Sequence, residues 1–191
     1  MKHSKVRQTI VETASELFYA KGYNLTGINE IIKEAGIAKA TLYSHFSSKE
    51  DICLAYLEYK DETFLSNLTA YLETKEEGKD KIFGLFSFLK QFFRDQDFNG
   101  CWCINTVSEI PKENQKIRET IQRQKNGLID LIKRLIDENL PAIESEQESN
   151  QLAKKVYLLY ESAIAESHLH RAVWPIDSAL ELCEITFNTY Q

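Results

Sequence analysis

The chain is poor in residues that interrupt helices. It has only three prolines and seven glycines in 191 residues, so long helices can run without a break. It also lacks any apolar run approaching the roughly 20 residues that a membrane span requires. The N-terminal stretch MKHSKVRQTI has no apolar segment of the kind found in signal peptides. We therefore expect a cytoplasmic protein in which the four cysteines are reduced.

Sequence patterns for catalysis and metal binding are also missing. The chain has no Ser/His/Asp arrangement, no glycine-rich phosphate loop and no tight Cys/His spacing. An enzyme would need a catalytic pair, which the sequence does not offer. We therefore expect neither enzyme activity, nor a cofactor, nor a metal site.

Positive charge is concentrated near the N-terminus. The net charge of the chain is −6, yet residues 1–49 carry seven Lys or Arg and four Glu, a net of +3. The remainder carries 16 basic and 25 acidic residues, a net of −9. A basic head on an acidic body indicates that only the head meets nucleic-acid phosphates.

Hydrophobic residues recur with helical periodicity along the chain, and no strand pattern occurs. The sequence therefore predicts an all-α fold of about nine helices. Their approximate ranges are 4–21, 26–35, 38–46, 48–71, 79–94, 100–110, 112–139, 149–168 and 175–189.

The stretch from residue 25 to residue 52 reads as a helix-turn-helix. Gly36 suits the left-handed conformation that ends a helix. Leu42 and Phe46, four residues apart, are expected to attach the second helix to the core. The residues between 38 and 46 include no carboxylate, so this helix can lie against a phosphate backbone without repulsion.

The side chains near this helix divide into two groups of DNA-binding candidates. Hydroxyl, imidazole and ammonium donors position a protein on phosphates, and the phosphate candidates are Thr26, Thr41, Tyr43, His45 and Lys49. Lysine suits guanine edges and a methyl group suits thymine, and the base-edge candidates are Lys39, Ala40 and Ser44. Tyr43 can instead be a core ring, and Lys39 a solvated lysine.

The head resembles the TetR/AcrR family of bacterial transcriptional repressors. The resemblance covers about 50 residues and rests on motif order and spacing. The residues that carry it are Phe18, Gly22–Tyr23, Thr26, Ile31–Ile32, Ala35–Gly36–Ile37, Thr41–Leu42–Tyr43, His45–Phe46 and Ser48–Lys49–Glu50. Many members have Ser or Thr at Ala38 and Gly at Ala40. Because Ala38 cannot cap a helix with a side-chain oxygen, the helix loses roughly 1 kcal/mol of stability.

The resemblance implies a helix-turn-helix DNA-binding domain at 1–50 and a helical ligand-binding and dimerisation domain at 51–191. It implies a homodimer formed through the helices at 149–168 and 175–189, a palindromic double-stranded DNA operator, and release by a small-molecule inducer. The rival interpretation is a helical partner-binding protein that has lost DNA binding. The carboxylate-free helix argues against this rival.

The second domain offers candidates for a ligand pocket. Its walls are predicted from Phe86, Phe92, Trp102, Asn105, Tyr157 and Tyr160, although core packing explains each of these residues equally well. Glu109 and Glu161 lie at the edges of apolar stretches. If buried, these two carboxylates favour a cationic or donor-rich ligand.

Cys101 is a possible redox sensor. It follows Gly100 near a predicted helix N-terminus, where the helix dipole makes a thiol more reactive. Cys103 lies two residues further on, about 200° around a helix, so the two thiols cannot readily form a disulfide. Some family members carry a Gly-Cys at a similar place and sense electrophiles or oxidants. A small buried hydrophobe is the more common role for such a cysteine.

Overall fold

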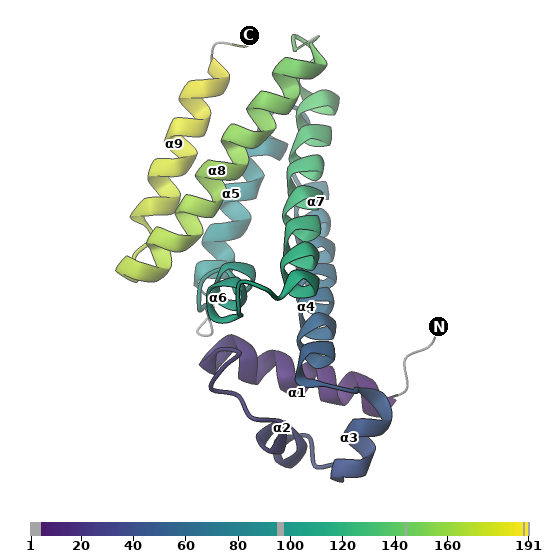
Figure 1. Cartoon of the computed structure of the whole chain (residues 1–191). Helices are drawn as coiled ribbons and strands as arrows, with labels where there is room; N and C mark the ends of the chain where they lie inside the picture. Colours follow the sequence, from purple (N-terminus) through teal and green to yellow (C-terminus); the bar gives the residue numbers. More distant parts are fainter. Residues whose placement is uncertain (1–4, 95–97, 144, 189, 191) are drawn as a thin grey trace. The chain divides into compact units, whose positions relative to one another are not determined.

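The computed structural model describes residues 5–94, 98–143, 145–188 and 190, and within these ranges the chain forms nine helices and no strand. This confirms the predicted all-α fold (Figure 1). The helices are α1 (Lys5–Lys21), α2 (Ile28–Glu34), α3 (Lys39–His45), α4 (Lys49–Glu73), α5 (Lys79–Phe93), α6 (Trp102–Glu109), α7 (Gln115–Asn139), α8 (Glu146–His170) and α9 (Trp174–Asn188).

Several helix ends follow directly from local sequence. Gly22 and Gly36 have φ angles of 90° and 65°, which place both in the left-handed region that favours glycine. Ser48 caps α4, because its hydroxyl oxygen accepts the Asp51 backbone N–H at 3.0 Å. Ala38 precedes α3 without a side-chain cap, as the sequence predicts.

The chain packs as two compact units. The first contains the residues up to Phe64 together with Trp102–Arg123, and the second contains Leu65–Cys101 and the residues from Gln124 onward. The segment 102–123 therefore packs with the N-terminal helices, although it lies far from them in sequence. The boundary at residue 50 between a DNA-binding and a ligand-binding domain remains a prediction.

In the first unit, α1, α2 and α3 pack on one another. Ile10, Ile31 and Leu42 are completely buried between them, and Tyr56 of α4 is 1% exposed. Apolar residues at helical spacing thus build a small core that fixes the position of α3. Figure 1 shows these three helices grouped near the start of α4.

In the second unit, α8 packs along α9, and α5 packs against both (Figure 1). Phe86 of α5 meets Tyr160 of α8 edge-on, with ring centroids 5.8 Å apart. Phe83 of α5 meets Phe187 of α9 in the same way at 6.4 Å. Aromatic rings therefore connect all three helices of this layer.

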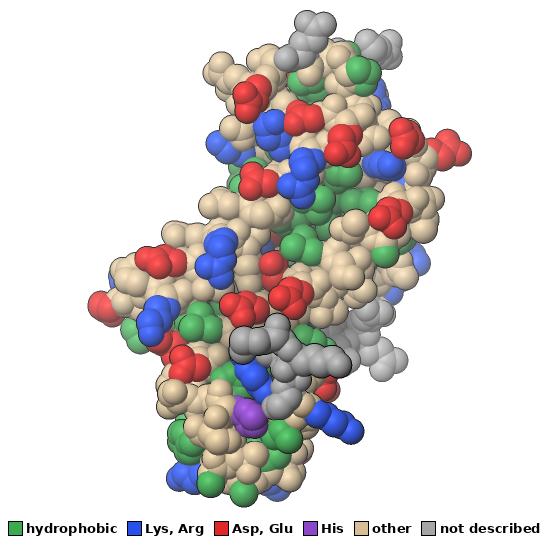
Figure 2. Space-filling model, turned by 90° about the vertical axis from the view of Figure 1, so that its right-hand side faces the viewer, with side chains coloured by type: hydrophobic (Ala, Val, Ile, Leu, Met, Phe, Trp, Pro, Cys, Tyr) green, Lys and Arg blue, Asp and Glu red, His purple; other side chains and the backbone are tan. Residues whose placement is uncertain are grey.

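On the face that Figure 2 shows, acidic and basic side chains are interspersed rather than gathered by sign.

Each helix in the described part of the chain is too short or too polar to cross a bilayer.

Candidate nucleic-acid interface

Helix α3 is held on the core by its two predicted anchors. Leu42 is completely buried and Phe46 is 3% exposed. The guanidinium of Arg7, on α1, lies over the Phe46 ring at 4.8 Å from its centroid, a cation–π contact that the sequence did not reveal. The anchors lie on one side of the helix, so the rest of its surface faces outward.

The outward surface of α3 carries donors and small groups. Lys39, Ala40 and Ser44 are exposed, and Thr41 and His45 are half-buried. Tyr43 is 45% exposed, which excludes the alternative that its ring belongs to the core. The helix sequence KATLYSH contains no carboxylate. This surface, which we call the α3 face, can therefore approach a polyanion.

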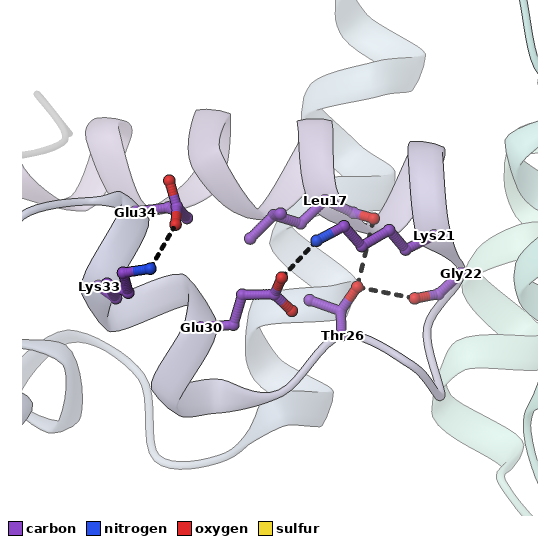
Figure 3. Close-up of polar contacts among 7 residues, drawn as sticks. All are labelled: Leu17, Lys21, Gly22, Thr26, Glu30, Lys33 and Glu34. Carbon is purple, nitrogen blue, oxygen red and sulfur yellow. Dashed lines mark hydrogen bonds and ion pairs between the residues drawn. The ribbon is translucent and has the colours of Figure 1, made fainter.

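Thr26 does not belong to this surface, and its predicted role as a phosphate contact is wrong. Its side chain is completely buried. Its hydroxyl donates to the backbone oxygens of Gly22 at 2.8 Å and Leu17 at 3.2 Å, which ties the turn before α2 to the end of α1 (Figure 3). Gly27, not Thr26, precedes α2 as its N-cap. The same view shows Lys21 of α1 paired with Glu30 of α2.

Lys49 stands at the first residue of α4, as predicted. Its ammonium lies 4.4 Å from the centroid of the Tyr23 ring. Partial burial lowers the pKa of Lys49, while the neighbouring Cys53 and Glu109 act to raise it. The ring and the neighbouring groups thus hold this cation beside the N-terminus of α4, where anions are attracted.

A hollow of about 340 Å³ opens beside α3 in the first unit. It is lined by Arg7, His45, Phe46, Ser47, Asp51, Leu54, Ala55 and Glu58. Its two carboxylates distinguish it from the α3 face. We assign no ligand to it.

The ligand-pocket candidates fall into the two packing units. Phe86, Phe92, Tyr157, Tyr160 and Glu161 belong to the second unit, whereas Trp102, Asn105 and Glu109 belong to the first. Phe92 packs on Phe98 at 5.7 Å, and Tyr157 is half-buried on α8. In the first unit, Asn105 is half-buried, and Trp102 packs on Phe64 at 5.3 Å.

Cys101 lies in a polar cluster of the second unit. The Lys125 ammonium donates to the Glu161 carboxylate at 2.6 Å and to the Cys101 sulfur at 3.1 Å. Lys125 and Glu161 are only 15% and 14% exposed. Glu161 is thus mostly buried, which the sequence left open, and its charge is met by a lysine 36 positions earlier, which no local pattern indicated.

Tyr160 completes this cluster. It is 1% exposed, and its hydroxyl has no hydrogen-bond partner among the described residues. Burial raises the pKa of Tyr160, and the neighbouring Glu161 raises it further. The phenol therefore stays protonated and can donate a hydrogen bond to a ligand.

All four cysteines are buried. Burial raises the pKa of both Cys53 and Cys183 to about 12, so these two remain thiols near neutral pH. Cys101 differs because an ammonium contacts its sulfur. Within the described ranges, no three His, Cys, Asp or Glu side chains gather in a way that would hold a metal ion.

Comparison with known proteins supports the DNA-binding interpretation. The sequence model for bacterial regulatory proteins of the tetR family matches residues 10–56, which include α2 and α3. The transcriptional repressor NemR of Escherichia coli is 24% identical to this chain over 94% of it and 93% of the repressor. The N-terminal head of this chain belongs to the TetR family. The matched family consists of bacterial regulatory proteins, and NemR is a transcriptional repressor.

Other transcriptional regulators show similar relationships. The biofilm operon regulator IcaR of Staphylococcus epidermidis, a negative transcriptional regulator, is 28% identical over 74% of this chain and 75% of its own length. A TetR-family regulator from Streptomyces coelicolor superimposes with a TM-score of 0.87 at 24% identity, covering 98% of this chain and 90% of that chain. The reduced form of E. coli NemR gives a TM-score of 0.78, also at 24% identity, over 94% and 95% of the two chains. These structures share the fold.

Proposed function

We propose that this chain is a TetR-family repressor that binds a palindromic operator as a homodimer, and that a small molecule releases it. The observation that carries the operator proposal is the α3 face. It presents a lysine, hydroxyls, an imidazole and a half-exposed ring without a carboxylate, on a helix fixed by Leu42 and Phe46. A rigid helix with an exposed donor-rich face fits the major groove.

The residues of the head divide the work. Thr41, Tyr43, His45 and Lys49 would contact phosphates and fix the orientation of α3. Lys39, Ala40 and Ser44 would meet base edges. The Ser44 hydroxyl donates to the Thr41 backbone oxygen at 2.7 Å, so its oxygen lone pairs are what it would offer to a base.

The dimer proposal rests on exposed apolar side chains of α8 and α9. Large hydrophobic residues on a soluble protein surface mark an interaction site when they gather on neighbouring elements. Those exposed by half or more on these two helices are Leu158 (64%), Leu169 (71%), Trp174 (52%), Leu182 (52%) and Ile185 (58%). A second copy using the same surface would cover them and place two heads for two half-sites.

A Leu182→Glu variant is expected to dissociate the dimer. Leu182 is 52% exposed on α9, so the folded subunit tolerates the charge. The interface does not tolerate it, because a buried unpaired carboxylate costs several kcal/mol. We expect the dimer dissociation constant, measured by sedimentation, to rise at least about a hundredfold.

Ile104→Glu is the matched control, since Ile104 is 51% exposed but lies on α6. We expect this variant to sediment as wild type. A Leu182→Glu protein that remains dimeric would show that α9 does not form the interface.

The release proposal rests on the cluster around Cys101. An ammonium donor beside a sulfur favours its anionic, nucleophilic form. The Tyr160 phenol is a buried donor without a partner among the described residues. A cysteine sulfur beside an ammonium, together with a buried phenol donor, suits an inducer that is an electrophile or an oxidant.

A further inference from the structure

Glu109 makes an unexpected contact in the first unit. It is the last residue of α6, and its carboxylate oxygen Oε2 accepts the backbone N–H of Asn24 at 2.7 Å. In return, the Asn24 side-chain amide donates to the backbone oxygen of Glu109 at 2.9 Å. The two residues are 85 positions apart in the sequence. A reciprocal pair of hydrogen bonds therefore joins α6 to the turn between α1 and α2.

Gly22 leaves room for this carboxylate. A Cβ atom at position 22 would lie 2.2 Å from Oε1 of Glu109, much closer than two such atoms can approach. The φ angle of Gly22 is +90°, so the turn also needs glycine for its backbone conformation. The absence of a side chain at position 22 thus permits the turn conformation and leaves space for the Glu109 carboxylate.

Thr26 also holds the turn. The Thr26 hydroxyl bonds the backbone oxygens of Leu17 and Gly22. Glu109 thus binds the backbone N–H in the middle of the segment 22–26, and Thr26 binds the backbone oxygen at its start. This segment leads directly into α2, which packs on α3. A change in the turn would therefore change how α3 is presented.

A second contact joins the same part of the chain to the head. The Asn114 side-chain amide donates to a Glu50 carboxylate oxygen at 2.8 Å, and Lys116 lies 3.5 Å from the other oxygen of Glu50. Glu50 is in the first turn of α4. The segment Glu109–Lys116, which we call the α6–α7 corner, thus contacts the head at two separate places.

We propose that Glu109 is a positioning residue for DNA binding, which holds the turn between α1 and α2 so that α3 is presented in its DNA-binding orientation. Glu109 would not contact DNA itself. Without its carboxylate, the turn would sample other conformations, and the apparent affinity would fall with the fraction of heads that remain competent. The DNA-binding head would then include a residue far outside the helix-turn-helix.

The experiment compares Glu109→Ala, Glu109→Gln and wild type on one DNA duplex, the tightest binder that wild type selects from a random pool. A hydrogen bond to a charged acceptor is worth enough to expect about tenfold weaker binding for Glu109→Ala. The affinity of Glu109→Gln for the duplex should fall less than about threefold, because its amide oxygen can still accept the Asn24 N–H. Glu113→Gln, an exposed carboxylate of the same corner, should bind as wild type.

Two further measurements separate positioning from contact. The slope of log affinity against log salt should be the same in Glu109→Ala and wild type, because no phosphate contact is lost. Hydrogen exchange of the Asn24 amide should be faster in Glu109→Ala. A Glu109→Ala protein with wild-type affinity would overturn the proposal, and so would a changed salt slope.

A third variant covers the case in which Glu109→Ala fails to fold. Asn24 is exposed, so Asn24→Ala should fold normally while it removes the hydrogen bond to the Glu109 backbone oxygen. We expect about threefold weaker binding, again with an unchanged salt slope. Wild-type affinity in Asn24→Ala would then overturn the proposal.

Discussion

An Ala40→Glu variant is expected to bind operator DNA at least about a hundredfold more weakly than wild type. Ala40 is an exposed residue in the first turn of α3. On the proposed DNA-facing surface, a carboxylate there would face phosphates and base-edge acceptors, and like charges held together cost several kcal/mol. A cost of about 3 kcal/mol corresponds to roughly a hundredfold loss of affinity.

The substitution should leave the fold intact. A glutamate in the first turn of a helix interacts favourably with the helix dipole, and the side chain at position 40 is exposed. Ala40→Gln is the control, because it adds nearly the same volume without charge. We expect its affinity for operator DNA to fall less than about tenfold. Fluorescence anisotropy of a labelled duplex measures the DNA affinity of wild type and of both variants. If Ala40→Glu bound operator DNA with an affinity within threefold of wild type, α3 would not be the helix that faces the DNA.

A Cys101→Ser variant is expected to stay on DNA when wild type is released by an electrophile. The probe is N-ethylmaleimide, which adds to a thiolate sulfur through its activated carbon–carbon double bond. In wild type, the Lys125 ammonium contacts the Cys101 sulfur at 3.1 Å, so this thiol should react first. We expect operator affinity to fall at least about tenfold on treatment of wild type, and to change little in Cys101→Ser.

Cys103→Ser is the matched control for this experiment. Cys103 is 1% exposed and lies two positions from Cys101, so the same chemical change is made beside the proposed sensor. We expect Cys103→Ser to be released like wild type. Equal release of Cys101→Ser and wild type would assign the response to another group and return Cys101 to the role of a buried hydrophobe.

The head was largely predictable because its determinants are local. Leu42 and Phe46 are four residues apart, a spacing that places both on one side of a helix, and both are buried. Ser48 and Asp51 form a cap over three residues. Ala38 lacks a side-chain oxygen, so its failure to cap α3 could be read directly from its identity. Local periodicity and capping rules act within one or two helical turns, where sequence and structure correspond most closely.

The errors and omissions share one physical origin, which is a partner distant in sequence. Thr26 has the residue type of an N-cap, but its hydroxyl donates instead to the backbone oxygen of Leu17 in α1. Glu161 meets Lys125, and Glu109 meets Asn24. Each of these polar groups is satisfied through tertiary packing, and a single sequence does not show which distant donor it will meet.

The most direct test of the central claim is the salt dependence of wild-type binding to its selected duplex. Lys39 and Lys49 of two heads would supply up to about four cationic phosphate or groove contacts, so log affinity should fall linearly with log salt with a slope of about −2 to −4. Ala40→Glu should bind too weakly for the same titration at moderate salt. An affinity that does not change with salt would contradict the proposal that the α3 face meets the phosphate backbone.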